Sequence, residues 1–293
     1  MADIFDNIIT LPSAEVQKQT ESLVGFQSKF DRIYNNLKLL LDKGSLSDWS
    51  KKHHKVDLPI ISQLKDKYPL IILAGDAGTG KTISATSIAD KMTRELKKEG
   101  FFLKLSTRVR GEGMHGEMGK LVNDAFTELK KQAGKKRLAF LLIDEADAIA
   151  TTRATGQMHQ EEKAAVNTLI QKIDEVREMD GRAILFMSTN RLHFIDEAIL
   201  RRAAIILEFN RPTKEEYKEL YAQSLEGMNL TGDELGELAK LSQKENESVG
   251  YSFSDVRLKV LPEAVAMAYP DKPLTFNLLK ETINNVKPSP EIK

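Results

Sequence analysis

Five short apolar runs alternate with stretches that carry apolar residues at helical spacing, and this alternation restricts the fold more than any other feature of the chain. The runs are PLIILAG (69–75), FFLKLS (101–106), LAFLLID (138–144), AILFMST (183–189) and AIILEF (204–209). Strands that are apolar on both faces and separated by helices are typical of a parallel sheet covered on both sides. The sequence therefore predicts an α/β domain with a five-stranded parallel sheet.

Helical stripes occupy the intervals between the runs. Apolar residues recur every four positions from Ile88 to Leu96, and we expect Gly100 to end that helix. Further stripes cover residues 121–129 and 160–178. Each of these stripes predicts a crossover helix that packs one face on the sheet.

The pattern of apolar residues changes after NRP (210–212), because no further strand-like run appears. Thr213 with Glu216 three residues later has the form of a capping box, which predicts the start of a helix. The first sixty residues hold one clear amphipathic helix and are too poor in strands for a domain of their own. The predicted division is an N-terminal segment (1–20), a large α/β domain (21–211), a small helical domain (212–285) and a tail (286–293) that we expect to be disordered.

Composition narrows the function classes further. Among the 293 residues, 43 Lys and Arg balance 43 Asp and Glu, so no overall field favours nucleic acid or an anionic membrane. The chain has no cysteine, which excludes disulfides and a cysteine nucleophile. No secretory signal or membrane span is visible, so we expect a cytoplasmic protein. His53 and His54 have no ligand partner at a suitable spacing and are interpreted as surface residues.

The stretch GDAGTGKT (75–82) fits the phosphate-loop pattern G-x-x-x-x-G-K-[ST], between an apolar strand and an amphipathic helix. Its glycines let successive backbone N–H groups point inward, and the following helix adds its positive N-terminal end. The residues expected to hold the nucleotide are Asp76, Ala77, Gly78, Thr79, Gly80, Lys81 and Thr82. Lys81 would reach the outer phosphates, and Thr82 would offer its hydroxyl to Mg²⁺.

Acidic residues follow the third apolar run, in FLLIDEAD. The carboxyl ends of parallel strands lie at the edge of the sheet where ligands bind. Asp144 is the candidate for holding the magnesium shell, and Glu145 is the candidate base that polarises an attacking water. The fourth run ends in Ser188, Thr189 and Asn190, and the Asn190 amide could orient that water without adding charge.

In order along the chain, GDAGTGKT, LLIDEAD, STN and IDEAILRRA resemble the AAA+ family of ATPases over about residues 20–285. The resemblance implies the strand order 5-1-4-3-2, a small helical lid, ATP and Mg²⁺ as cofactors, and a ring that is usually a hexamer with ATP at the subunit interfaces.

Several individual residues match positions that have a role in that family. Arg201 and Arg202 lie where arginine fingers reach the neighbouring subunit, and Arg202 is favoured. A guanidinium there would spread the charge that develops on the γ-phosphoryl group. SFSDVRLKVLPEAV resembles the second sensor segment, with Arg257 as the residue that touches phosphate. LVGF (23–26) resembles the segment beside the adenine, which makes Val24 and Gly25 candidates.

A narrower resemblance, to the pachytene-checkpoint type of AAA+ remodeller, is carried by GEMGKLVNDAF, VNTLIQKIDEVR and LPEAVAMAYPDKPLTFNLL. It implies a HORMA-domain client, alongside a nucleotidyltransferase in a bacterial cyclic-nucleotide anti-phage system. The glycine-rich stretch RVRGEGMHGEMG (108–119) would be the pore loop that grips the client, with Met114 and His115 at its centre.

Three alternatives stay open at this point. The first is a DNA-associated AAA+ ATPase of initiator or clamp-loader type, which balanced charge and missing cysteine disfavour. The second is a small-molecule kinase with the same phosphate loop, which would need neither the paired arginines nor a long helical lid. The third is a catalytically silent ATP-bound scaffold, which the intact Lys81, Asp144, Glu145 and Asn190 disfavour.

Overall fold

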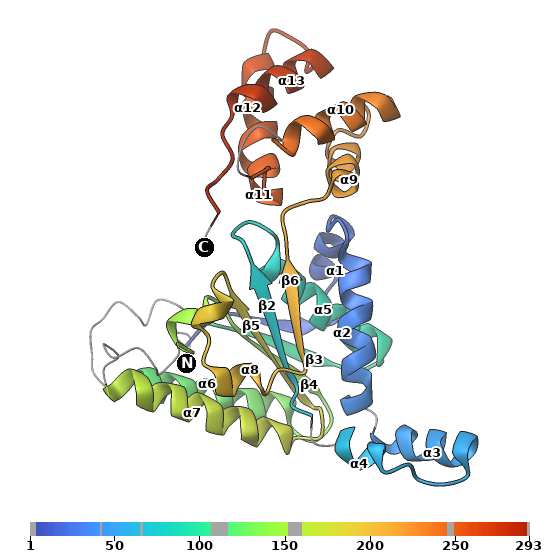
Figure 1. The fold of residues 1–293 in the computed structure, drawn as a ribbon, viewed down its shortest axis with the longest axis vertical. Coiled ribbons are helices and arrows are strands. Elements are labelled where there is room, and N and C mark those ends of the chain that lie inside the picture. Colours follow the sequence, from blue (N-terminus) through green and yellow to red (C-terminus); the bar gives the residue numbers. More distant parts are fainter. Residues whose placement is uncertain are drawn as a thin grey trace. The chain divides into compact units, whose positions relative to one another are not determined.

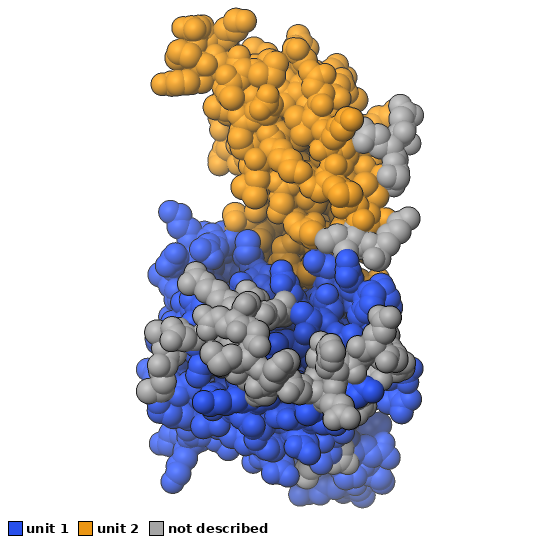
Figure 2. Space-filling model, turned by 90° about the vertical axis from the view of Figure 1, so that its left-hand side faces the viewer, with its two compact units in different colours: residues 1–21, 26–74, 82–207 blue, residues 22–25, 75–81, 208–293 orange. Residues whose placement is uncertain are grey.

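The computed structural model describes residues 4–41, 43–64, 67–106, 117–151, 160–244 and 249–291. The chain forms two compact units, coloured separately in Figure 2. The sheet unit contains residues 1–21, 26–74 and 82–207, and the lid unit contains residues 22–25, 75–81 and 208–293. The predicted boundary after residue 211 stays a prediction, although the last stretch of the lid unit begins close to it.

Within the described residues, one sheet has six strands, in the order β1-β3-β4-β5-β2-β6. They are β1 (Phe5–Leu11), β2 (Leu70–Gly75), β3 (Gly100–Leu105), β4 (Leu138–Ile143), β5 (Ala183–Thr189) and β6 (Ile205–Phe209). β5 pairs in parallel with both β2 and β4, and β3 pairs in parallel with β4. The five predicted strands therefore follow one another in the predicted order, and β2 and β4 are separated by β5 (Figure 1).

The prediction of a five-stranded, all-parallel sheet is wrong in one respect, because β1 adds a sixth strand antiparallel to β3. β1 lies at the edge, and only Phe5 and Leu11 at its two ends are buried. The residues between them are exposed or half-buried and mix polar side chains with Ile8 and Ile9, which gives neither a long apolar run nor a clear alternation, so the signal used for the other strands is missing. The register also shifts between Phe5 and Asn7.

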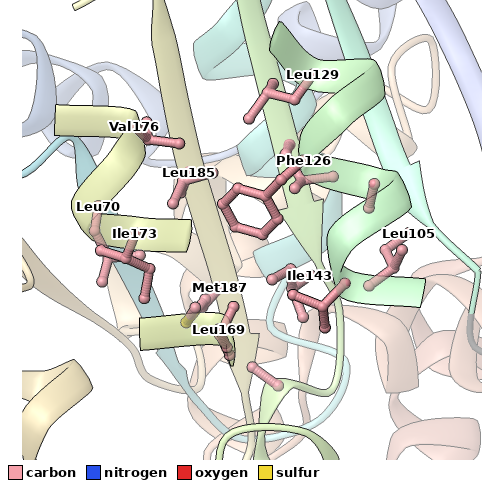
Figure 3. Packing of buried hydrophobic residues seen from close by; sticks show 14 of the residues in the cluster. Leu70, Leu105, Phe126, Leu129, Ile143, Leu169, Ile173, Val176, Leu185 and Met187 are labelled. Carbon is pink, nitrogen blue, oxygen red and sulfur yellow. The ribbon is translucent and has the colours of Figure 1, made fainter. Parts of the chain in front are cut away.

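Helices cover both faces of the sheet. Those of the sheet unit are α1 (Ala14–Glu21), α2 (Phe26–Leu41), α3 (Lys43–His54), α4 (Ile60–Leu64), α5 (Lys81–Glu95), α6 (Glu117–Ala133), α7 (Gln160–Arg177) and α8 (Glu197–Leu200). α6 and α7 lie on one side, and α2 and α5 lie on the other (Figure 1). Figure 3 shows apolar side chains of α6 and α7 meeting those of the strands. The two-sided burial explains why the strands are apolar throughout.

The end of α5 differs from the prediction. The helix ends at Glu95, not at Gly100, and Lys97 adopts a left-handed conformation with φ 51°. Gly100 is the first residue of β3, where an added Cβ would lie 2.8 Å from the Leu138 carbonyl oxygen. Gly100 is therefore needed for the close approach between strands, and the left-handed residue that follows the helix is Lys97.

The lid unit is a small helical bundle with its own core. Its helices are α9 (Lys214–Ser224), α10 (Gly232–Ser242), α11 (Phe253–Asp255), a π-helical turn (Val256–Val260), α12 (Leu261–Ala268) and α13 (Phe276–Asn285). The predicted capping box of Thr213 and Glu216 begins α9, and a second one begins α10. Buried tyrosines anchor the bundle: the Tyr251 hydroxyl donates to the carbonyls of Ile283 (2.8 Å) and Val286 (2.6 Å).

The C-terminal segment is held in place through Ser289, contrary to the expected disorder of the tail. The Ser289 backbone N–H donates to the Asp255 carboxylate (3.2 Å), and its hydroxyl donates to the other oxygen (2.6 Å). Asp255 is buried and also accepts hydrogen bonds from the backbone N–H and hydroxyl of Ser252, at 2.9 Å each. Composition did not reveal these contacts because they depend on a carboxylate 34 residues away.

Among the described residues, no helix combines the length and the apolar composition that a membrane crossing requires.

We expect Asp255 to make the stability of the lid pH-dependent. Burial raises the pKa of this carboxyl, but hydrogen bonds from Lys259, Ser289 and Ser252 outweigh it, so the pKa lies below its ordinary value. A depressed folded-state pKa contributes stability that is present above the unfolded pKa of about 4 and is lost as the pH falls towards the folded pKa. Replacing the charged acceptor should cost about 1.5–3 kcal/mol at neutral pH.

Denaturant titrations of Asp255→Asn and the native chain check this prediction. The difference in unfolding free energy should be largest near about pH 7 and shrink by about pH 3. Asp233→Asn is the matched control, because Asp233 is exposed in the first turn of α10. A difference that is constant over this range would contradict the prediction.

Candidate active site

The phosphate-loop sequence connects the end of β2 to the start of α5, as predicted. Three of its glycines have positive φ: Gly75 (148°), Gly78 (74°) and Gly80 (90°). A Cβ on Gly75 would lie 2.1 Å from the Phe209 carbonyl oxygen, so this position requires glycine for space as well as for φ. A Cβ on Gly78 would lie 2.8 Å from side-chain atoms of Ser252 and Ser254. The loop is thus shaped by backbone conformations that other residues rarely adopt.

Within the lid unit, hydrogen bonds converge on the carbonyl of Asp76. The Lys81 ammonium donates to it (2.8 Å) and to the Gly75 carbonyl (2.9 Å), and the Thr79 hydroxyl donates to it as well (2.7 Å). The Asp76 side chain accepts from the backbone N–H of Ala77 (2.8 Å). Lys81 is buried and rests on two neutral acceptors. A phosphate would give this ammonium a stronger, charge-assisted partner.

Within the sheet unit, donors converge on Asp144, the residue after β4. The Thr82 hydroxyl donates to Asp144 Oδ2 (3.0 Å), the Ser188 hydroxyl donates to Oδ1, and the Lys104 ammonium lies 3.1 Å from Oδ2. Burial raises the pKa of the Asp144 carboxyl, but the hydrogen bonds from Ser188, Lys104 and Thr82 and the charge of Lys104 outweigh it. The pKa lies below its ordinary value, so the carboxyl is ionised at neutral pH.

Thr82 and Asp144 fit a magnesium site. A hydroxyl and a carboxylate are the hard oxygen ligands that Mg²⁺ prefers, and Mg²⁺ commonly binds through one or two protein groups together with phosphate oxygens. No group of three or more His, Cys, Asp or Glu side chains in the described part of the chain forms an all-protein cage for a metal. The arrangement therefore suits an ion delivered with a nucleotide.

Glu145, the candidate base, follows Asp144 directly and is exposed. Its backbone is left-handed, with φ 48° and ψ 47°, and its N–H donates to Asp144 Oδ1 (3.1 Å). A non-glycine residue in this conformation is strained, and such strain concentrates at functional sites. Asn190 is the residue after β5 and is partly buried. It follows Thr189, whose hydroxyl donates to Asp147 (2.8 Å).

The two candidate finger residues have different surroundings at the end of α8. Arg202 forms a two-point ion pair with Asp174, Nε to Oδ1 at 2.7 Å and Nη2 to Oδ2 at 3.1 Å, and its side chain is 24% exposed. Donation to the Asp174 carboxylate raises the pKa of the Arg202 guanidinium. Arg201 is 79% exposed and pairs with Glu197 on the same helix (3.2 Å).

The three candidates for the lid and the adenine pocket, Arg257, Val24 and Gly25, all belong to the lid unit. Arg257 lies in the π-helical turn and donates to the Ser22 carbonyl, and burial lowers the pKa of its guanidinium. Val24 is buried in the lid core, and Gly25 has φ 66°. Sequence separation does not suggest this proximity, which links residues more than 230 positions apart.

The remaining predicted positions are the two pore-loop residues and the two histidines interpreted as surface residues. Met114 and His115 lie outside the described residues, so their role stays a prediction. His53 and His54 are exposed on α3, and their rings lie 5.9 Å and 5.3 Å from the ring of Trp49. An exposed aromatic cluster is consistent with the surface interpretation of both histidines.

Two residues with direct contacts to the motifs were missed from the sequence. Lys104 is the one charged residue in the run FFLKLS, and a charge in a buried strand was an available signal. Arg211 follows β6 and pairs with Asp76, Nε to Oδ2 at 2.7 Å. Nothing local marked Arg211, because its partner lies 135 positions earlier in the chain.

Comparison with known proteins identifies the family of the chain. The profile of the ATPase family associated with various cellular activities (AAA) matches residues 71–211. CD-NTase-associated protein 6 of Escherichia coli (strain KTE188) is 43% identical over 290 residues, which cover 99% of this chain and 97% of that protein.

Two solved structures are similar along almost the whole chain. A chain of the E. coli MS115-1 HORMA:CdnC:Trip13 complex has a TM-score of 0.91 at 35% identity, covering 99% of this chain and 98% of that one. The structure of Rhizobiales Trip13 has a TM-score of 0.77 at 29% identity, covering 98% of this chain and all of that one.

The Lys104 contact predicts a measurable shift at Asp144. In Lys104→Met the ammonium's hydrogen bond and charge are lost while burial remains, so the pKa of the Asp144 carboxyl should rise from its depressed value. Carboxyl-carbon NMR titrations without nucleotide measure this shift. Lys130→Met is the matched control, since that ammonium pairs with Glu175 between α6 and α7. An unchanged Asp144 pKa in Lys104→Met would show that the ion pair does not persist in solution.

Proposed function

Because the chain belongs to the AAA family of ATPases, we propose that it is a ring-forming ATPase that uses ATP hydrolysis to remodel a HORMA-domain protein. The observation that carries the proposal is the similarity along almost the full length to a chain of a complex described as HORMA:CdnC:Trip13. The 43% identical relative is named as a CD-NTase-associated protein, which supports a place beside a nucleotidyltransferase in anti-phage defence. We infer a homo-hexamer from the family resemblance.

Each residue of the two motifs has a role in this proposal. The Lys81 ammonium exchanges its two carbonyl partners for the outer phosphates, and the N–H groups from Ala77 to Thr82 bind them as well. Thr82 and Asp144 hold Mg²⁺, which would neutralise charge on the phosphate oxygens. Glu145 accepts a proton from the attacking water, and Asn190 orients that water.

The proposal assigns the lid a role in contacting the bound nucleotide. Arg257 would contact phosphate, and Val24 and Gly25 would lie beside the adenine. Support comes from the contact of Arg257 with Ser22 and from the burial of Val24 in the lid core, which place the three residues on one unit. Met114 and His115 are proposed to grip the client.

The central experiment measures ATP turnover with and without a HORMA-domain protein. We expect stimulation by the HORMA protein and none by DNA; stimulation by DNA alone would overturn the remodelling proposal.

Glu145→Gln should bind ATP and lose turnover by about a hundredfold or more, because the amide keeps the shape but cannot accept the proton. Native turnover in Glu145→Gln would remove the assignment of the base.

The finger hypothesis predicts complementation between subunits. Arg202→Ala should lower turnover by about a thousandfold and leave ATP affinity nearly intact, because its charge acts on the neighbouring site. Arg201→Ala is the matched variant. Arg202 is ion-paired with Asp174 of its own subunit, so it must break this pair before it can reach the neighbouring site. Mixed rings of Arg202→Ala and Lys81→Ala subunits should recover part of the activity. If no ratio recovers activity, or if Arg201→Ala is the variant that complements, the assignment of Arg202 is wrong.

A further inference from the structure

The ion pair between Asp76 and Arg211 ties the phosphate loop to the segment after β6. Arg211 Nε donates to Asp76 Oδ2 (2.7 Å), and Arg211 Nη2 lies 2.5 Å from the same oxygen. Both side chains are largely buried, with 10% of Asp76 and 12% of Arg211 exposed. A charge pair shielded in this way is screened less by water than a surface pair, and loss of one partner leaves a buried charge behind.

The same guanidinium contacts two further segments of the lid unit. Its Nη1 donates to the Gly250 carbonyl before α11, and its Nη2 donates to the Ser289 carbonyl (2.8 Å) in the C-terminal segment. A guanidinium is planar and has five N–H donors in a fixed fork, so one side chain can bind three acceptors at defined angles. Lysine cannot reproduce this geometry.

The lid also contacts the loop backbone next to this pair. The Ser254 N–H donates to the Gly78 carbonyl (3.1 Å), at the start of α11. Asp255, in the same turn, holds Ser289 through the two hydrogen bonds already described. Lys259 donates to the Ser289 hydroxyl (2.6 Å). The loop, the start of α11 and the C-terminal segment therefore share one connected network of hydrogen bonds.

Asp76 is where this network meets the nucleotide-binding groups of the loop. Its carboxylate accepts from Arg211 and from the Ala77 N–H, while its carbonyl accepts from Thr79 and Lys81. One residue therefore joins the Arg211 ion pair to the groups that hold the Lys81 ammonium. Loss of the ion pair removes one restraint on Asp76, whose carbonyl is an acceptor for that ammonium.

We propose that Arg211 is a positioning residue for the phosphate loop: it acts through Asp76, and the Ser289 carbonyl of the C-terminal segment holds its guanidinium in place. This inference rests on the proposed binding of ATP by the loop. The role predicts that substitutions at these positions weaken ground-state nucleotide binding, so that KM rises while kcat at saturating ATP is nearly unchanged. A general loss of folded protein would instead lower kcat and leave KM unchanged.

The experiment measures the affinity of the full chain for a fluorescent ATP analogue with Mg²⁺. Arg211→Gln and Asp76→Asn should each weaken binding by about tenfold or more, the factor that loss of a hydrogen bond to a charged group gives. The double variant should be no weaker than the weaker single variant, because both changes break the same pair. Arg211→Lys should bind with intermediate affinity, since it keeps the charge without the fork.

A matched control and a tail variant complete the test. Lys280→Gln breaks another ion pair of the lid, Lys280 to Glu237 at 2.5 Å, and should leave affinity unchanged. Ending the chain after Val286 removes the Ser289 carbonyl and should weaken binding severalfold in the native background, but not in Arg211→Gln.

The outcomes separate this inference from the proposed function. A native chain that binds no nucleotide overturns both. A native chain that binds, with Arg211→Gln equal to Lys280→Gln in affinity, overturns the positioning role alone, as does full additivity of Arg211→Gln and Asp76→Asn. If Arg211→Gln does not fold, Arg211→Lys decides, because native affinity and native KM in that variant overturn the inference.

Discussion

The hydrogen bond from the Thr82 hydroxyl to the Asp144 carboxylate is the contact on which the sheet-unit half of the site depends. Thr82 is the last residue of the phosphate-loop motif after β2, and Asp144 follows β4, but these strands are separated by β5. The two residues therefore meet across the end of β5, and Ser188 of β5 binds the second oxygen of the same carboxylate. The strand order, together with the two motifs, creates this constellation, because it brings the ends of β2, β5 and β4 to the same edge of the sheet with Ser188 between them.

The fold could be predicted from the sequence wherever a segment carries its own signal. The four strands β2 to β5 are buried on both faces, so each reads as an apolar run, and the order of the five recognised strands came from the family resemblance. β1 was missed because it is an edge strand whose inner positions are exposed or half-buried and mix polar with apolar residues. The end of α5 was misplaced for a related reason. Gly100 looked like a helix stop, but what it supplies is room beside the Leu138 carbonyl of the neighbouring strand, which depends on tertiary pairing.

In the candidate site, too, some residues carry a local sequence signal and others depend on tertiary contacts. The phosphate loop, Asp144 and Glu145 are recognisable because their chemistry is encoded in contiguous residues, and the positive φ of Gly75, Gly78 and Gly80 accounts for that spacing. Arg211 carries no local signal, and Lys104 carries only that of a charge in an apolar run, which does not identify its partner, since each residue matters through a carboxylate brought to it by the fold. Glu145 shows a third limit, because its identity was evident but its left-handed backbone was not. That conformation turns the chain sharply after Asp144, so the two adjacent acids have different surroundings, one partly buried among donors and the other exposed.

The division of the chain into compact units passes between Lys81 and Thr82, so the loop that would hold the phosphates is grouped with the lid, while the hydroxyl that would hold magnesium is grouped with the sheet. The loop's own carbonyl at Gly78 and carboxylate at Asp76 are bonded to residues of the lid unit. Contact between lid and loop therefore does not require a bound nucleotide as an intermediary. Arg257 adds a further contact within the same unit, because it donates to the Ser22 carbonyl. The chain crosses between the two units at 21–22, 25–26, 74–75, 81–82 and 207–208, and the crossing at 81–82 is the one inside the phosphate-loop motif, where the residue proposed to bind phosphate is bonded directly to the residue proposed to bind magnesium.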